Sequence, residues 1–482
     1  MNTREPADTG AGEDAGGRPM VEGAGPPVRQ FGLLRLRRFA PLFWTQLLGA
    51  FNDNVFKQAV IIFITFRLLG QSSADDASAE TARMVTISAL VFILPFALLS
   101  ASAGQIADKY DKATLFRWVK AAEVVIMCGA AAAFLLESMP LLLILLFLMG
   151  AQSTFFGPLK YATLPQHLWR SELVGGNGLI QMSTYVAILV GTLAGGVAMD
   201  LLGPVPVAVA VVMVALAGLT TSQFVPSAPP PSPQLRVDPN IVRQSLRVIG
   251  RARRDATVFA AIVGISWFWF LGATFVQVIP AYGRDVLGGQ PSVVNLIMAA
   301  FSTGIGIGSL LCETLVRSRR SIGLVPAGAL GLVLLSFGAV LFGPDTSAHA
   351  PASRGAAQVL ADPSSWLVLF GFMGFALCGG LYIVPLYAHL QARSDPLYRA
   401  RIIAANNVLN AVLMVLSGVM TLVLLRLAVP LSWIFAVAGL LTIPVVGLIL
   451  LRAPALRHAG RALRAPEPAA RPSDTAATVT RK

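Results

Sequence analysis

The sequence predicts an all-α integral membrane protein with twelve transmembrane helices, arranged as two pseudo-symmetric bundles of six. Three observations predict this fold class. Of the 482 residues, 55% are hydrophobic and only 13% are charged, against about 45–50% and 25% in soluble proteins. Twelve apolar runs reach the roughly 20 residues that a helix needs to cross the hydrocarbon core of a bilayer. One long polar break, 227–256, divides these runs into six and six.

The domain organisation follows from these runs. Residues 1–30 are rich in Gly, Ala, Pro and acidic residues, which predicts a disordered tail without a cleaved signal peptide. An N-terminal bundle over 31–226, a Pro/Arg-rich linker over 227–256 and a C-terminal bundle over 257–451 follow, and 452–482 form a basic tail. The predicted spans are 39–66, 84–103, 115–136, 140–160, 177–201, 204–225, 257–281, 292–314, 322–343, 365–388, 402–425 and 430–451.

The distribution of basic residues predicts the orientation, because Lys and Arg accumulate in cytoplasmic loops. With the N-terminus inside, 31 of the 37 Lys and Arg fall in cytoplasmic pieces and five in outside loops. A missed helix would invert every later loop, so this division favours twelve spans with both termini cytoplasmic. It also assigns the net charge of +13 to topology and contact with anionic lipids, and not to nucleic-acid binding.

The two halves show internal similarity. Leu48-Gly49-Ala50 matches Leu271-Gly272-Ala273, which places Asn54 opposite Gln277. Asn177 and Gln181 match Asn406 and Asn410. These polar residues, spaced four apart on their helices, either line a central cavity or form hydrogen bonds between helices.

The first span carries an unusual polar group. Phe51-Asn52-Asp53-Asn54 and Lys57 begin about 14 residues, or roughly 21 Å, into the run. A charge at such depth costs about 2.5–3.5 kcal/mol and indicates a functional site. Asp53 and Lys57 are four residues apart, so they are placed to form an ion pair. The alternative is that they only neutralise each other and fix the packing. Asn52 and Asn54 favour function, since neutralisation does not require them.

A second motif lies between the second and third spans. This motif is similar to the G-x-x-x-D-[RK] signature of the major facilitator superfamily, and it reads Gly104-Gln-Ile-Ala-Asp108-Lys109, followed by Lys112. It departs from the signature at Asp111, where many members have Gly. A carboxylate such as Asp108 can accept hydrogen bonds at the start of a neighbouring helix. Glu313 occupies the corresponding place in the second half. These residues are expected to gate the protein and not to bind its substrate.

Two further charged residues lie in or near predicted spans. Glu123 is a candidate partner for a lysine or a proton site. Lys160, beside Pro158 at the predicted end of its span, either snorkels to the cytoplasmic surface or contacts a lipid headgroup phosphate.

Several runs together resemble the lysophospholipid transporter family of the major facilitator superfamily. They are Gln46 to Lys57, Phe155 to Leu168, Trp267 to Ala273, Gly308 to Glu313 and Ile403 to Asn410. The resemblance covers about 31–451, and it implies transport of lysophospholipid, chiefly lysophosphatidylethanolamine, across the bacterial inner membrane for reacylation. It also implies a separately encoded acyltransferase as partner. Carried over by position, the acid of the FNDN run is Asp53. Because Asp53 and Lys57 share one helix face, we expect Lys57 to suit the phosphate of the lysophospholipid headgroup and Asp53 its ammonium group.

Other functions are less well supported. Proton-driven efflux of amphiphilic compounds is the main alternative, with Glu123 or Asp53 as the protonated group. An acyltransferase in this chain is not expected, because the usual acyltransferase box has an Asp after four residues that follow a His, and none of the four histidines fits it; His167 has Glu172 at that position. Cys128, Cys312 and Cys378 lie in apolar stretches with no C-x-x-C pair and no His at ligand spacing, so neither a disulfide framework nor a zinc site is expected. No cofactor is expected either.

Overall fold

The computed structural model describes residues 28–64, 74–317, 323–341 and 354–458. Within these ranges the regular structure is helical, apart from one isolated bridge between Gly289 and Arg354. The first half contains α1 (Gln30–Leu33), α2 (Ala40–Phe63), α3 (Ala74–Lys109), α4 (Lys112–Leu135), α5 (Met139–His167), α6 (Leu173–Leu202) and α7 (Pro204–Gln223). A linker helix, α8 (Ile241–Ala252), follows.

The second half repeats this pattern with shorter additional pieces. It contains α9 (Ala256–Ala281), α10 (Pro291–Arg317), α11 (Leu324–Ser336), α12 (Gly338–Leu341), α13 (Ala356–Ala361), α14 (Pro363–Arg393), α15 (Arg399–Arg426) and α16 (Leu431–Arg452). Each of the twelve predicted runs therefore coincides with a helix, and α11 and α12 share one run.

Eleven helices in the described ranges are long and apolar enough to cross a membrane. The helix of the first predicted span, α2, is not among them, although it has 24 residues. Asn52, Asp53, Asn54 and Lys57 lower the mean hydropathy of α2. The structure thus supports a multi-pass membrane protein, and the twelfth span and the cytoplasmic termini stay predictions.

Local sequence signals set many helix boundaries. Asp111, Asn240 and Asp255 each accept a hydrogen bond from a backbone N–H in the first turn of the next helix, which is the usual role of an N-cap residue. Gly203 has a φ of 79° and Pro204 begins α7, so α6 and α7 meet in a tight turn. Only glycine adopts this backbone conformation without strain.

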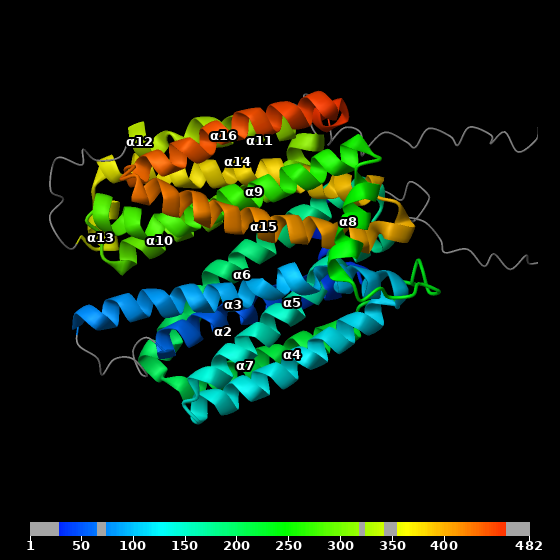
Figure 1. The fold of residues 1–482 in the computed structure, drawn as a ribbon, viewed down its shortest axis with the longest axis horizontal. Coiled ribbons are helices and arrows are strands. Elements are labelled where there is room, and N and C mark those ends of the chain that lie inside the picture. The colour runs from blue at the N-terminus through cyan, green and yellow to red at the C-terminus, as the bar shows by residue number, and fades with distance from the viewer. Residues whose placement is uncertain (1–27, 65–73, 318–322, 342–353, 459–482) are drawn as a thin grey trace, which may run out of the picture.

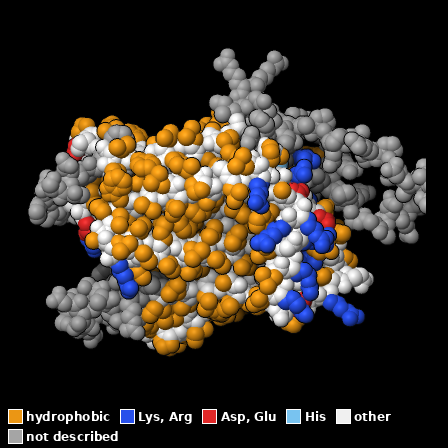
Figure 2. Space-filling model, turned by 45° about the horizontal axis from the view of Figure 1, so that its top comes forward, with side chains coloured by type: hydrophobic (Ala, Val, Ile, Leu, Met, Phe, Trp, Pro, Cys, Tyr) orange, Lys and Arg blue, Asp and Glu red, His pale blue; other side chains and the backbone are white. Residues whose placement is uncertain are grey.

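The two groups of helices lie side by side. In Figure 1, α2 to α7 occupy the lower half and α9 to α16 the upper half. The halves contact each other mainly through α6 against α10 and α14, and through α3 and α5 against α15. Figure 2 shows a broad band of hydrophobic side chains, with Lys and Arg gathered at one end of the molecule. We call this the basic end, and the band is the surface expected to face lipid.

Three features differ from the sequence-based expectations. The predicted linker contains the helix α8. The helix α5 continues to His167, past Pro158 and past the predicted end at 160. Gln30, assigned to the disordered tail, is buried at the start of α1. Residues 1–27 of that tail and residues 459–482 of the predicted C-terminal tail lie outside the described residues.

Candidate functional site

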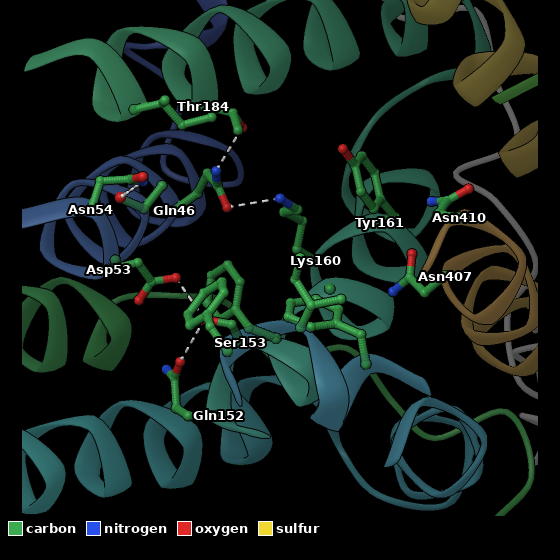
Figure 3. Close-up of a pocket in the computed structure, with 18 of the residues that line it drawn as sticks. Gln46, Asp53, Asn54, Gln152, Ser153, Lys160, Tyr161, Thr184, Asn407 and Asn410 are labelled. Carbon is green, nitrogen blue, oxygen red and sulfur yellow. Dashed lines mark hydrogen bonds between the residues drawn. The ribbon is translucent and has the colours of Figure 1, made fainter. Parts of the chain in front are cut away.

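A cavity of about 350 Å³ lies between the two halves. Its walls come from α2, α3, α4, α5 and α6 of the first half and from α9, α14 and α15 of the second. Phe92, Phe96, Phe156, Ile188 and Met414 give it an apolar lining. Charged and polar side chains enter from the first half (Figure 3). The cavity therefore combines surfaces suited to a hydrocarbon chain and to a charged group.

The polar group of α2 forms one wall. Ser153 Oγ on α5 donates a hydrogen bond of 2.6 Å to Asp53 Oδ2. Lys57 Nζ donates to Asn54 Oδ1 at 3.0 Å and lies 5.6 Å from the centre of the Phe92 ring. No ion pair joins Asp53 to Lys57 among the salt bridges of the described residues. The predicted ion pair is thus replaced by two separate contacts, which leaves both charges available at the cavity.

Lys160 forms a neighbouring part of the wall. Its Nζ donates to Gln46 Oε1 at 3.0 Å, and Gln46 Nε2 donates to Thr184 Oγ1 at 2.9 Å (Figure 3). Lys160 lies seven residues before the end of α5 and is only 9% exposed. The snorkelling alternative is therefore wrong, because the ammonium group faces the cavity and not the surface.

A buried ion pair adjoins this wall, and its lysine also lines the cavity. Lys120 Nζ and Glu123 Oε2 are 2.6 Å apart on α4, and both side chains are 1% exposed. Asn52 donates to Glu123 Oε1 at 3.1 Å and Gln152 to Oε2 at 3.0 Å, so both carboxylate oxygens have partners. Hydrogen bonds of this kind are needed to offset the cost of burying charges.

Gly49 on α2 allows this arrangement. A Cβ atom at Gly49 would overlap Lys120 Nζ. The matching residue of the second half, Gly272, has open space around it. The lack of a side chain at position 49 therefore makes room for the ion pair.

The second half contributes neutral side chains to the cavity. Trp269, Tyr387, Asn407 and Asn410 line it. Figure 3 shows Asn407 and Asn410 on the opposite side from Asp53 and Gln46. All charged residues among the described lining residues, Asp53, Lys57, Lys120 and Lys160, belong to the first half. The cavity is thus electrostatically one-sided.

Aromatic and amide contacts between the halves lie near the cavity. Tyr161 and Tyr387 stack with ring centres 4.3 Å apart and planes inclined by 9°. Asn177 on α6 donates to Gln391 Oε1 at 2.7 Å, and Gln391 on α14 donates back to Asn177 Oδ1 at 3.0 Å. Both amides are fully buried. These contacts join the halves between the cavity and the basic end.

Asp108 adds a charged contact at the basic end. It accepts hydrogen bonds from the backbone N–H groups of Ala400 and Arg401, and Arg401 Nε lies 2.8 Å from Asp108 Oδ2. A Cβ at Gly104 would lie 2.6 Å from the Cβ of Ala404 and 2.9 Å from Arg401 Cα. Gly104 therefore lets α3 approach the start of α15 closely.

The other predicted gating residues also lie at this end. Glu313 on α10 accepts from the Gln30 backbone N–H at 2.7 Å. Lys109 lies over the Tyr110 ring at 5.5 Å. Lys112 is 2% exposed, and its backbone N–H donates to Ala228 O at 3.2 Å. Their positions fit a gate, but their role in gating stays a prediction.

Comparison with known proteins identifies the family. The sequence pattern of the Major Facilitator Superfamily matches residues 42–360. This chain belongs to the Major Facilitator Superfamily. The match spans α2 to α13 and so includes the charged wall of the cavity and α9 on the other side.

Named relatives within this superfamily share most of the chain. The chain is 25% identical over 362 residues to "Lysophospholipid transporter LplT" of Serratia proteamaculans, covering 74% of this chain and 80% of the relative. It is 28% identical over 356 residues to the protein of the same name from Escherichia coli strain SE11, covering 72% and 78%. The chain is thus similar to lysophospholipid transporters.

Solved structures show the same fold. The human organic anion transporter MFSD10 aligns with a TM-score of 0.66 at 13% identity, covering 87% of this chain and 99% of that one. The Escherichia coli fucose:proton symporter FucP (N162A) aligns with a TM-score of 0.60 at 12% identity, covering 87% and 98%.

The predicted substrate residues separate into two groups. Five of them line the cavity, namely Asp53, Asn54, Lys57, Gln181 and Asn410. Four lie outside it, namely Asn52, Glu123, Gln277 and Asn406. Asn52 and Glu123 belong to the buried ion-pair network. Gln277 donates instead to Ser417 Oγ at 3.4 Å within the second half.

Sequence reasoning missed several residues of the site. Lys120 carries the signal of an i, i+3 pair with Glu123 inside a predicted span, which would have identified it. Gln46 stands in an apolar run beside Thr45, and Asn407 directly follows Asn406, so neither residue stands out by itself. Trp269 and Tyr387 give no signal that separates a cavity wall from ordinary packing. Among the described residues, no group of three or more His, Cys, Asp or Glu could hold a metal ion.

Proposed function

We propose that this protein moves lysophospholipids, with lysophosphatidylethanolamine as the main substrate, across the bacterial inner membrane by alternating access. The cavity carries this proposal, because it places one acid, Asp53, and three lysines, Lys57, Lys120 and Lys160, beside apolar walls. A lysophospholipid has a single acyl chain and a headgroup that combines a phosphate with, in this case, an ammonium group. The relatives named above support the same substrate class.

The headgroup would bind to the first half. Lys57 and Lys160 suit the phosphate, and Asp53 suits the ammonium group. The Ser153 hydrogen bond to Oδ2 leaves Asp53 Oδ1 without a hydrogen-bond partner among the described residues. A buried acceptor without a donor is costly, so a substrate donor at Oδ1 would remove that cost.

Transport requires the contacts at the basic end to separate. By the distribution of Lys and Arg this end is cytoplasmic, so the structure would represent a state closed to the cytoplasm. Tyr161–Tyr387, Asn177–Gln391 and Asp108–Arg401 would form successive layers of the gate. The product would then be reacylated by a separately encoded acyltransferase, and we infer no catalytic step in this chain.

Uptake by proteoliposomes tests the proposal. Purified protein is given lysophosphatidylethanolamine, lysophosphatidylcholine or lysophosphatidylglycerol, with and without an imposed proton or sodium gradient. Asp53→Asn should abolish uptake and leave the protein folded. Asp200→Asn, at an exposed position of α6 outside the cavity, is the matched control. Undiminished uptake by Asp53→Asn would contradict the assignment of Asp53.

Proton-coupled export of amphiphilic compounds is the second candidate. The buried and unpartnered Oδ1 of Asp53 favours it, because a carboxyl group in such a place can alternate between protonation states. Transport of an amphiphilic drug only in the presence of a pH gradient, with no movement of lysophospholipid, would support this candidate against the first.

A further inference from the structure

The linker helix α8 lies against the flank of the bundle at its basic end. Asp238, just before α8, donates its backbone N–H to Gln105 Oε1 at 2.7 Å, and its carbonyl accepts from Gln105 Nε2 at 3.1 Å. Gln105 is four residues from the end of α3, or about 6 Å along the helix. The segment leading into α8 is therefore level with the last turn of α3 and does not lie beyond it.

The far end of α8 is fixed to the second half. Arg251 Nη2 lies 3.3 Å from Asp395 Oδ2, and its guanidinium group lies 3.4 Å from the centre of the Tyr398 ring. Tyr398 directly precedes α15, and Asp395 begins the short helical turn that ends at Tyr398. Contacts with both α3 and α15 show that α8 crosses their ends, as Figure 1 also shows. A helix in this place is expected at the height of the lipid headgroups.

One face of α8 packs on the protein and a second, apolar face does not. Gln244, Val248 and Ala252 are buried and mark the inner face. Val242 and Leu246, one turn apart, are 69% and 66% exposed. Residues four apart lie on the same side of a helix, so these two side chains form an exposed apolar stripe.

A basic stripe runs beside the apolar one. The side chains of Arg243 and Arg247 are 61% and 60% exposed. Both contact one acid, Asp238, at 3.0 Å and 3.6 Å. Residues 236–254 contain six arginines and this single acid. The surface of α8 therefore keeps an excess of positive charge after its ion pairs are formed.

We propose that α8 is a docking surface for the anionic phospholipid headgroups of the surrounding bilayer. A helix that lies in the membrane interface buries its apolar stripe about 5–10 Å into the boundary between headgroups and acyl chains. Clustered Lys and Arg beside a membrane attract anionic lipids. The stripe of Val242 and Leu246 meets the first condition, and that of Arg243 and Arg247 meets the second. This binding surface is separate from the cavity and does not depend on the transported substrate.

A fluorescent label at Leu246 tests the proposal in the full-length protein. Cys128, Cys312 and Cys378 are replaced by Ser, Leu246→Cys is labelled with an environment-sensitive fluorophore, and the protein is reconstituted in vesicles. The vesicles contain phosphatidylcholine alone or mixed with phosphatidylglycerol, each with a lipid that carries a nitroxide close to its headgroup. The matched control is a label at Gln234→Cys, which is exposed in the linker before α8.

We expect the label at 246 to shift its emission to shorter wavelength and to lose intensity through the nitroxide, more strongly with phosphatidylglycerol. The label at 234 should show neither change. The double substitution Arg243→Gln and Arg247→Gln, or high salt, should remove the additional emission shift and quenching that phosphatidylglycerol causes. A label at 246 that behaves like the label at 234 would overturn the proposal. Equal quenching with and without phosphatidylglycerol would also overturn it, since the arginines would then recognise no anionic headgroup.

Discussion

Asp53 on α2 accepts a 2.6 Å hydrogen bond from Ser153 on α5, although Lys57 lies only one turn away on the same helix. The acid is therefore oriented by a neighbouring helix and not by the nearest cation. Lys57 turns to Asn54 and the Phe92 ring instead. An acid and a base that do not neutralise each other are both available to a substrate that carries two opposite charges.

Ser153→Ala should weaken transport without unfolding the protein. The hydrogen bond joins a hydroxyl to a carboxylate, and such bonds contribute about 1.5–3 kcal/mol, so we expect the initial rate of lysophospholipid uptake to fall by roughly ten- to a hundredfold. Ser183→Ala is the control, because Ser183 is buried but donates only to Ile180 O of its own helix. Equal rates for the two variants would show that Ser153 does not orient Asp53 for transport.

Gly49→Ala should destabilise the protein, whereas Gly272→Ala should not. The new methyl group at position 49 would displace Lys120 from its contact with Glu123, and overpacking of this kind costs about 1–3 kcal/mol. At position 272 the methyl group meets open space, and Ala favours a helix by about 1 kcal/mol over Gly. Apparent melting temperatures in detergent would measure both effects. A drop of the same size in both variants would contradict the role given to Gly49.

Joining Asn177 to Gln391 should stop transport. The two amides belong to different halves, so a covalent link between cysteines at these positions would keep the basic end closed. In a background without native cysteines, a short reducible cross-linker should arrest uptake, and a reductant should restore it. The control links Thr45 to Thr221, whose hydroxyl groups are 2.9 Å apart on α2 and α7 of the same half. Continued uptake by the cross-linked Asn177/Gln391 pair would contradict this gate.

Asp111 should make a pH-dependent contribution to stability. Partial burial raises its pKa, but hydrogen bonds from the Thr114 N–H, the Ser227 hydroxyl and the Ala228 N–H outweigh burial and hold the pKa below its usual value. A lowered pKa in the folded state stabilises the protein above the unfolded pKa, about 3.9, and this contribution disappears as the pH falls through the folded pKa.

The comparison of Asp111→Asn with the unchanged protein measures this contribution. The difference between their apparent melting temperatures should be largest near neutral pH and should decrease as the pH drops below about 4. The Asp111 carboxylate joins the segment after α7 to the start of α4 through hydrogen bonds. Because these bonds are short-range contacts, the difference in melting temperature at neutral pH should depend little on the salt concentration. A difference that does not change with pH would exclude a role for the charge of Asp111.

The sequence could predict the long helices because each coincides with a largely apolar run, whereas the short and basic α8 was missed. It could predict Asp53 because a charge at that depth is rare. Its limits came from groups whose partners lie far away in the chain. Lys160 was ambiguous at the apparent end of a span, since the continuation of α5 beyond Pro158 depends on packing. The repeat placed Gln277 opposite Asn54, but Gln277 finds Ser417 inside its own half.

The aromatic contact of Tyr161 with Tyr387 was also beyond sequence reasoning. The two residues are separated by 226 positions, and nothing in either apolar run distinguishes a side chain at the boundary between halves from one in the core. The same holds for Gln391, the partner of Asn177. Such contacts depend on how the halves are rotated against each other, which hydropathy does not encode.

The one-sided distribution of charge in the cavity has a consequence for how selectivity could evolve. If the halves rotate against each other, a headgroup held by Asp53, Lys57 and Lys160 stays in the frame of the first half, while the second half moves past it. Preferences for the headgroup and for the rest of the molecule would then be inherited separately. Chimeras that exchange whole halves between related transporters should transfer the headgroup preference with the half that contains α2 and α5.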